Sequence, residues 1–270
     1  MKKRIWQSFV RRLFQSLLLV FRILSWGAAQ KCGDLFGILA YRISARYRKV
    51  ADKNLIIAFG DALTAGEREK ITQLSCSSFG RATAEFLKGS TAPVKSVCAR
   101  LLSHADLTLP KRLLARGHGL IVVTAHLGNF ELLARSGALA GISVLVVARQ
   151  SEDTEFNRLT DSLRENGGSK VHARGDSPRA LLAHLRSNGV VAILPDQKSE
   201  DVFVPFFGRL SGTVAGPAVL ALKTGAPILP AFAPRQPNGA YRIEYGDEID
   251  TAPTGDRKAD MHRIMADINI

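Results

Sequence analysis

The feature that most constrains this chain is an apolar run, residues 119–125, that ends at a histidine. The run is rich in β-branched residues and carries no charge, which is typical of a strand covered on both faces of a parallel sheet. A helix-like pattern begins at Glu131, so His126 should lie between a strand and a helix. Ligands bind at the carboxyl edge of open α/β sheets, and the sequence therefore predicts a functional site around His126.

Expected strands and helices alternate after this run, which predicts βαβ units and an α/β fold with a mainly parallel mixed sheet and flanking helices. Thr64 and Glu67 have the spacing of a capping box for a helix that continues to about Leu87. We expect residues 237–239 to join the last two strands as a hairpin, and residues 208–212 to form a loop. The expected strands are 119–125, 142–148, 170–173, 189–194, 227–233 and 241–245; the expected helices are 94–102, 130–140, 154–166, 178–188, 214–223 and the stretch from 257 onward.

The basic charge of the chain is concentrated near its start. Of the formal net charge of +13, residues 1–50 carry +10, from eleven Lys or Arg and one acid, Asp34. This uneven distribution argues against a nucleic-acid-binding surface spread over the whole protein. The three cysteines have no paired spacing, so we expect neither a disulfide framework nor a zinc site.

The first 50 residues are apolar but interrupted by arginines and lysines. On a helix, Arg4, Arg11 and Arg22 fall along one stripe, and bulky residues such as Trp6 and Phe9 occupy the other faces. Such a helix suits the interface of an anionic membrane. A tilted spanning helix and a helix packed on its own domain are the alternatives. We expect residues 1–50 to be a membrane-anchoring segment and residues 51–270 to be the α/β domain.

His126 has the setting of a general base, although a capped core histidine is the alternative. Glu131 could turn back to one ring nitrogen and leave the other basic. The chain contains no Gly-x-Ser-x-Gly elbow and no His-Glu-x-x-His zinc pair. A base without a protein nucleophile indicates activation of a substrate hydroxyl, and hence transfer of a group between two bound substrates.

Three further polar residues are candidates for function. Arg149 and Asp196 each come after an expected strand, and Arg164 lies near the end of a helix. Solvated surface arginines are the ordinary alternative for Arg149 and Arg164. We expect Arg149 and Asp196 at the same carboxyl edge of the sheet as His126.

These residues resemble the bacterial lipid A biosynthesis lauroyl/myristoyl acyltransferases, within the lysophospholipid acyltransferase superfamily marked by His-x4-Asp/Glu. The resemblance covers most of the chain, and its motifs follow one another in the order that the family has. It is carried by His126-Leu-Gly-Asn-Phe-Glu131, Arg149, Arg164 with Gly167, Pro195-Asp196-Gln197, Val202-Phe-Val-Pro-Phe-Phe-Gly208, Thr213 with Gly216, and Thr224-Gly225-Ala226-Pro227.

The resemblance implies an acyltransferase that moves a fatty acyl chain from acyl carrier protein to a hydroxyl of a lipid A precursor. It implies that His126 is the general base, that Glu131 orients it, and that Arg164 stabilises the developing oxyanion. The implied substrate-binding residues are Asn129, Arg149, Asp196 and Gln197. It also implies an inner-membrane protein whose active site faces the cytoplasm, with the bilayer, the glycolipid and acyl carrier protein as partners, and without metal, cofactor or nucleic acid.

Two departures from the family pattern leave alternatives open. Acidic residues follow Arg149, and the chain ends at Ile270 without the Trp-rich basic ending that the resemblance implies, so we expect a shortened C-terminus. One alternative is acylation of another glycolipid or of a lysophospholipid with acyl-CoA as donor. The other is a catalytically silent homologue that still binds lipid or acyl carrier protein.

Overall fold

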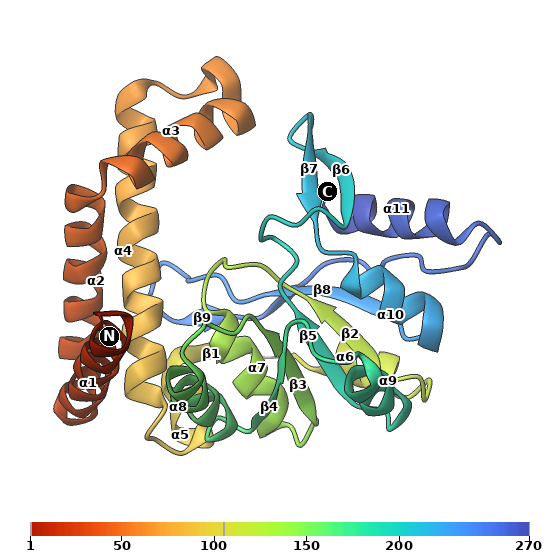
Figure 1. Ribbon diagram of the computed structural model, residues 1–270, viewed down its shortest axis with the longest axis horizontal. Helices are drawn as coiled ribbons and strands as arrows, with labels where there is room; N and C mark the ends of the chain where they lie inside the picture. Colours follow the sequence, from red (N-terminus) through yellow and green to blue (C-terminus); the bar gives the residue numbers. More distant parts are fainter. Residues whose placement is uncertain (1, 105, 270) are drawn as a thin grey trace. The chain divides into compact units, whose positions relative to one another are not determined.

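The computed structural model describes residues 2–104 and 106–269 of the chain. Two compact units are present, Met1–Ala92 and Pro93–Ile270. This division rests on packing, whereas the predicted division after residue 50 concerns membrane anchoring and stays a prediction. The first unit is helical, and the second contains the sheet (Figure 1).

Helix α2 packs along helix α4 in the N-terminal unit (Figure 1). Glycines allow this close approach, because a Cβ on Gly37 would lie 2.1 Å from the carbonyl oxygen of Cys76. The predicted capping box of α4 is confirmed, since Thr64 and Glu67 exchange hydrogen bonds of 3.3 and 2.8 Å. The elements of this unit are α1 (Lys2–Ile23), α2 (Trp26–Ile43), α3 (Ala45–Phe59), a 3-10 turn η1 (Gly60–Ala62) and α4 (Ala65–Gly89).

Helix α1 buries one apolar side and exposes another. Phe21 is buried in a cluster with Ala29 of α2 and Leu87 of α4, whereas Trp6 and Phe9 are more than half exposed. Among the described residues, no helix combines the length and the apolar character needed to cross a bilayer. Membrane association of this region stays a prediction.

The C-terminal unit is built on a sheet with the strand order β10-β8-β2-β5-β3-β4. All of its strand pairs are parallel except β10 with β8, which confirms the predicted mainly parallel mixed sheet. Within the described residues its strands are β2 (Leu120–Val123), β3 (Val144–Ala148), β4 (Ser169–Ala173), β5 (Val190–Ile193), β8 (Ile228–Phe232) and β10 (Glu244–Tyr245).

Helices cover both faces of this sheet, which explains the unbroken apolar run of β2. Ile121 and Val123 face a cluster that includes side chains of α9, α10 and α11, whereas Leu120 faces a cluster with Leu113 of α6. The helices of this unit are α5 (Val94–Leu101), α6 (Thr108–Leu114), α7 (Phe130–Leu139), α8 (Thr154–Glu165), α9 (Arg179–Arg186), α10 (Gly216–Thr224) and α11 (Arg257–Ile268).

The structure corrects two of the expected elements. Residues 208–212 do not form a loop: β7 (Arg209–Thr213) pairs antiparallel with β6 (Val202–Phe206) through a two-residue turn. The expected strand 241–245 is split, because β9 (Tyr241–Arg242) pairs with β1 (Leu102–His104), and only β10 pairs with β8. The predicted reversal at 237–239 is present, since the Gln236 N–H donates to the Ala240 carbonyl at 2.7 Å.

Candidate active site

His126 lies just beyond the carboxyl end of β2, as its place in the sequence predicts. The backbone turns there because Gly128 has a φ of +64° and lies so close to Ala233 that a Cβ would come within 2.0 Å of that carbonyl oxygen. The ring of Phe130 meets the imidazole edge-on, with the ring centroids 5.0 Å apart. The imidazole is about one-third exposed, so a substrate can reach it.

Asp196 holds His126 through two contacts. The imidazole Nδ1 lies 2.9 Å from Asp196 Oδ1, and the His126 backbone N–H donates to Asp196 Oδ2 at 2.8 Å. A carboxylate only accepts hydrogen bonds, so in the neutral form of the imidazole Nδ1 carries the proton and Nε2 presents a lone pair. The amide nitrogen of Gln197 lies 3.5 Å from that Nε2, so Gln197 is also at the site.

The pKa of Asp196 is lowered from its ordinary value. Burial acts to raise this pKa, but the hydrogen bonds from the side chain and backbone of His126 outweigh it. Asp196 is therefore an anion at neutral pH. An anion at this position favours the Nδ1–H tautomer and stabilises an imidazolium when one forms.

Glu131 does not contact His126 in this way, which corrects the predicted geometry. Arg164 donates to Glu131 from Nε at 3.0 Å and from Nη2 at 2.8 Å, and both side chains are largely buried. Glu131 lies in the first turn of α7, where the helix dipole favours a carboxylate. The structure thus pairs the predicted orienter with the predicted oxyanion residue. The catalytic roles of both stay predictions.

Asn129 has a structural position. Its side chain is buried, and its Oδ1 accepts the N–H of Leu132 at 3.0 Å, which caps α7. The cap fixes where α7 begins and so where Phe130 and Glu131 point. Contact between Asn129 and a substrate stays a prediction.

Three arginines line a cavity that His126 also lines. Arg149 follows β3 and is exposed, and Arg164 of α8 lies nearby in the cavity wall. Arg174 follows β4 and lines the same cavity, and its Nη2 donates to Ser199 Oγ at 3.4 Å. Arg174 was missed by the sequence analysis, although its place directly after a strand at this edge of the sheet was a usable signal.

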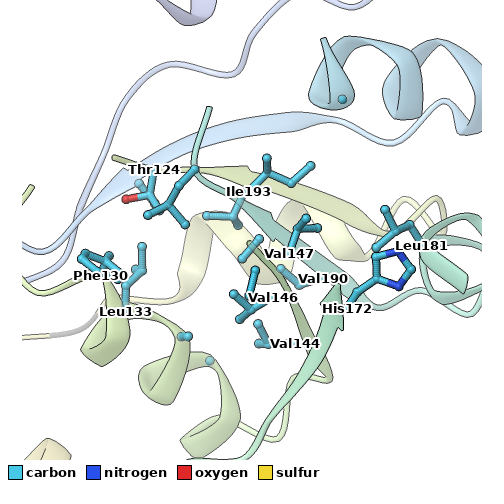
Figure 2. Close-up of a pocket in the computed structure, with 18 of the residues that line it drawn as sticks. Thr124, Phe130, Leu133, Val144, Val146, Val147, His172, Leu181, Val190 and Ile193 are labelled. Carbon is cyan, nitrogen blue, oxygen red and sulfur yellow. The ribbon is translucent and has the colours of Figure 1, made fainter. Parts of the chain in front are cut away.

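The cavity measures about 420 Å³ and is mostly apolar. Figure 2 shows Phe130 and Leu133 of α7 at one end, His172 and Leu181 at the other, and valines of β3 and β5 between them. His126, Glu131 and Gln197 belong to its wall. A long apolar ligand could therefore enter the core of this unit with its reactive end beside His126.

Two buried polar atoms in the cavity wall have no hydrogen-bond partner among the described residues. They are Thr124 Oγ1, close to His126 in the sequence, and His172 Nε2. The unbroken apolar run of residues 119–125 gave no hint that Thr124 would face a cavity. In residues 2–104 and 106–269, no group of three His, Cys, Asp or Glu side chains is arranged to hold a metal ion.

Comparison with known proteins identifies relatives of this chain. A family model described as bacterial lipid A biosynthesis acyltransferase matches residues 2–270. Phosphatidylinositol mannoside acyltransferases from two strains of Mycobacterium tuberculosis are 30% identical over 173 residues, which cover 58% of this chain and 52% of each relative. A lipid A biosynthesis acyltransferase from Haemophilus influenzae is 34% identical over 97 residues, 33% of this chain and 30% of that protein.

The chain spans about half the length of the mycobacterial relatives that it matches. The family model, by contrast, extends over both compact units of the structure. The order of motifs around His126, and their placement at one edge of the sheet, agree with this match. This chain belongs to the bacterial lipid A biosynthesis acyltransferase family.

Proposed function

We propose that this protein transfers a fatty acyl chain from a thioester donor to a hydroxyl group of a membrane glycolipid. The observation that carries the proposal is the pairing of Asp196 with Nδ1 of His126, which lines an apolar cavity. That pairing leaves Nε2 as a proton acceptor, and the cavity has the character of an acyl-chain site.

The reaction balances with His126 as the only proton carrier. Nε2 takes the proton of the acceptor hydroxyl while its oxygen attacks the thioester carbonyl. The tetrahedral intermediate then collapses, the carbon–sulfur bond breaks, and the imidazolium returns the proton to the leaving thiolate. Asp196 stabilises the imidazolium between these two steps.

The surroundings of the arginines in the cavity wall support the roles proposed for them. Arg149 is exposed and free to meet an anionic group of the glycolipid. Arg164 is held in place by Glu131, so its guanidinium is preorganised for the negative charge that develops on the carbonyl oxygen. In this proposal Glu131 positions Arg164, and Asp196 takes the part of the orienter of His126.

For the donor and acceptor we propose acyl carrier protein and a lipid A precursor, at the cytoplasmic face of the bacterial inner membrane. The basic N-terminal region suits both an acidic carrier and an anionic bilayer. A second candidate acceptor is a mannosylated phosphatidylinositol with acyl-CoA as donor. It is favoured by the 30% identity to phosphatidylinositol mannoside acyltransferases.

The experiment offers the purified protein both donor and acceptor pairs and analyses the lipids by mass spectrometry. We expect the wild type to add one acyl chain to one acceptor, and His126→Ala to lower that rate by about 10²-fold or more. The matched control is His262→Ala. His262 is a histidine of α11 and is not among the residues that line the cavity. Unchanged turnover in His126→Ala, or carrier binding without transfer by the wild type, would contradict the proposal.

A further inference from the structure

The β6–β7 hairpin carries an apolar surface that folding does not explain. Val202 and Val204 of β6 point into the core of the C-terminal unit, and Val204 is completely buried. Because side chains alternate along a strand, Phe203 and Pro205 point the other way. Their cross-strand partners are Gly212 and Leu210, so this outer face continues across both strands.

Large side chains cover the outer face and the tip of the hairpin. Phe203, Phe206 and Phe207 are about half exposed, and Leu210 is 73% exposed. Between residues 202 and 216 the sequence holds a single charged residue, Arg209, and it is a cation. In Figure 1 the hairpin projects away from the six-stranded sheet of its unit.

The turn is made with an unfavourable residue. Phe207 has a φ of +47° and is followed by Gly208 at +71°, the left-handed pair that two-residue hairpins use. Asn or Gly would adopt the first position with little strain, whereas an aromatic residue there is uncommon. Apart from Asn188, no other non-glycine residue in the described part of the chain has a positive φ. Strain of this kind is retained where a side chain serves a function.

The base of the hairpin is fastened to the segment that carries Asp196. Thr213 Oγ1 donates to the carbonyl of Pro195 at 2.8 Å, and the Ser199 N–H donates to the carbonyl of Gly212 at 3.1 Å. Gln197 follows Asp196, and Val214 follows Thr213 at the end of the hairpin. Both residues line the cavity. A ligand held by the hairpin is therefore held at a defined place relative to His126.

We propose that the tip of this hairpin, residues 203–210, inserts into the headgroup region of an anionic bilayer and brings the cavity to the membrane-bound acceptor. This inference rests on the proposed function, because it assumes a membrane lipid as acceptor. Aromatic and leucine side chains with one arginine suit the boundary between headgroups and acyl chains. From ordinary side-chain areas the tip offers roughly 400 Å², about half of what each partner contributes to a standard protein interface.

A single-tryptophan reporter tests this insertion directly. Both tryptophans of the chain, Trp6 and Trp26, lie in the N-terminal unit, so Trp6→Phe/Trp26→Phe provides a silent background. Two variants are made in this tryptophan-free background, Phe207→Trp and Leu139→Trp. Leu139 is exposed and is the last residue of α7. The full chain is mixed with vesicles of phosphatidylcholine and phosphatidylglycerol in equal amounts, with and without bromine on the acyl chains.

We expect the emission of the Phe207→Trp variant to shift to shorter wavelength on vesicles and to be quenched by the brominated lipid several-fold more than that of Leu139→Trp. Equal quenching of the two variants, or an unquenched Phe207→Trp reporter while the protein sediments with the vesicles, overturns the proposal. A shift that appears without vesicles and grows with protein concentration assigns the tip to a protein contact and also overturns it.

Quenching requires no turnover, so its failure is distinguishable from failure of the proposed function. A second variant, Phe206→Ser/Phe207→Ser, tests whether insertion of the tip contributes to acyl transfer. We expect it to transfer to a vesicle-embedded acceptor about tenfold more slowly or worse, and to a detergent-dispersed acceptor at the wild-type rate. Leu139→Ser is its control and should change neither rate. An equal loss with both forms of acceptor would contradict membrane docking.

Discussion

At the scale of single residues, the site is defined by which carboxylate contacts the His126 imidazole and which contacts Arg164. Glu131 lines the same cavity as His126, but it is Asp196 that lies within hydrogen-bonding distance of the imidazole. Glu131 is engaged by Arg164 instead. The two acids should therefore respond differently to removal of their charge.

The first prediction compares these two carboxylates. In Asp196→Asn, the side chain no longer stabilises an imidazolium, so we expect turnover to fall by about 10²- to 10⁴-fold. In Glu131→Gln, we expect the pH dependence of turnover to keep its shape while the protein loses thermal stability, because Arg164 loses its buried partner. Steady-state rates across pH and thermal melts measure both effects. A changed pH profile in Glu131→Gln and an unchanged one in Asp196→Asn would reverse the assignment.

The second prediction concerns Tyr245, which lines the cavity. Burial raises its pKa to about 12 from an ordinary value of 10.0, and the negative charge of Asp106 adds to the rise. The folded state thus holds this proton more tightly than the unfolded state, so stability is lost as the pH rises from about 10 to about 12. Tyr245→Phe should flatten that loss in urea unfolding curves. Tyr47→Phe, at an exposed tyrosine, should leave the pH dependence as in the wild type.

At the scale of secondary-structure elements, two close approaches depend on small residues and on turns. Helices α2 and α4 meet where Gly33, Gly37 and Gly80 remove side chains from the contact. The β6–β7 pair depends on the left-handed turn at Phe207 and Gly208. At the helix contact a Cβ would collide with the backbone of the neighbouring helix. At the hairpin the turn requires a positive φ at two successive residues.

The third prediction tests the helix contact. Gly37→Ala would place a methyl group 2.1 Å from the Cys76 carbonyl oxygen, so we expect a loss of about 1–3 kcal/mol from overpacking. Gly27→Ala, on the same helix with nothing within 4 Å, should be neutral or stabilise by up to about 1 kcal/mol. Chemical unfolding followed by circular dichroism compares the two. Equal stabilities would show that α2 and α4 are not in close contact.

At the scale of the whole molecule, the cavity exists because several elements of the C-terminal unit surround it. Its wall takes residues from β2, β3, β5, α7, α8 and α9. The N-terminal unit is a separate compact body with its own core. Acyl-chain length should therefore be set within residues 93–270.

The fourth prediction follows from the cavity. Val146 lies among the valines in its middle (Figure 2), so Val146→Phe should fill part of it. We expect a preference for donors shorter by a few carbons, because each methylene that loses its place costs about 0.8 kcal/mol. Competition between thioesters of different length measures this preference. Leu139→Phe, on the exposed side of α7, should leave it unchanged, and a shift in both variants would argue against this cavity as the acyl site.

The sequence by itself determined the periodic part of the fold. The apolar run before His126, the helix caps and the alternation of strands and helices are local patterns, and they correctly predicted a mainly parallel sheet with a helix start at Thr64. The same local reasoning placed His126, Arg149 and Asp196 at the carboxyl ends of strands. It failed at β7, because a left-handed Phe is not a usual turn residue.

Only the tertiary structure decided which of these side chains meet. Strand β5 lies between β2 and β3 in the sheet, although it follows both in the sequence, and this insertion brings Asp196 beside His126. Glu131, five residues from His126, is instead turned by the first turn of α7 toward Arg164 of α8. Nearness along the chain suggested the wrong contact, because strand order and helix direction depend on long-range packing that no local pattern encodes.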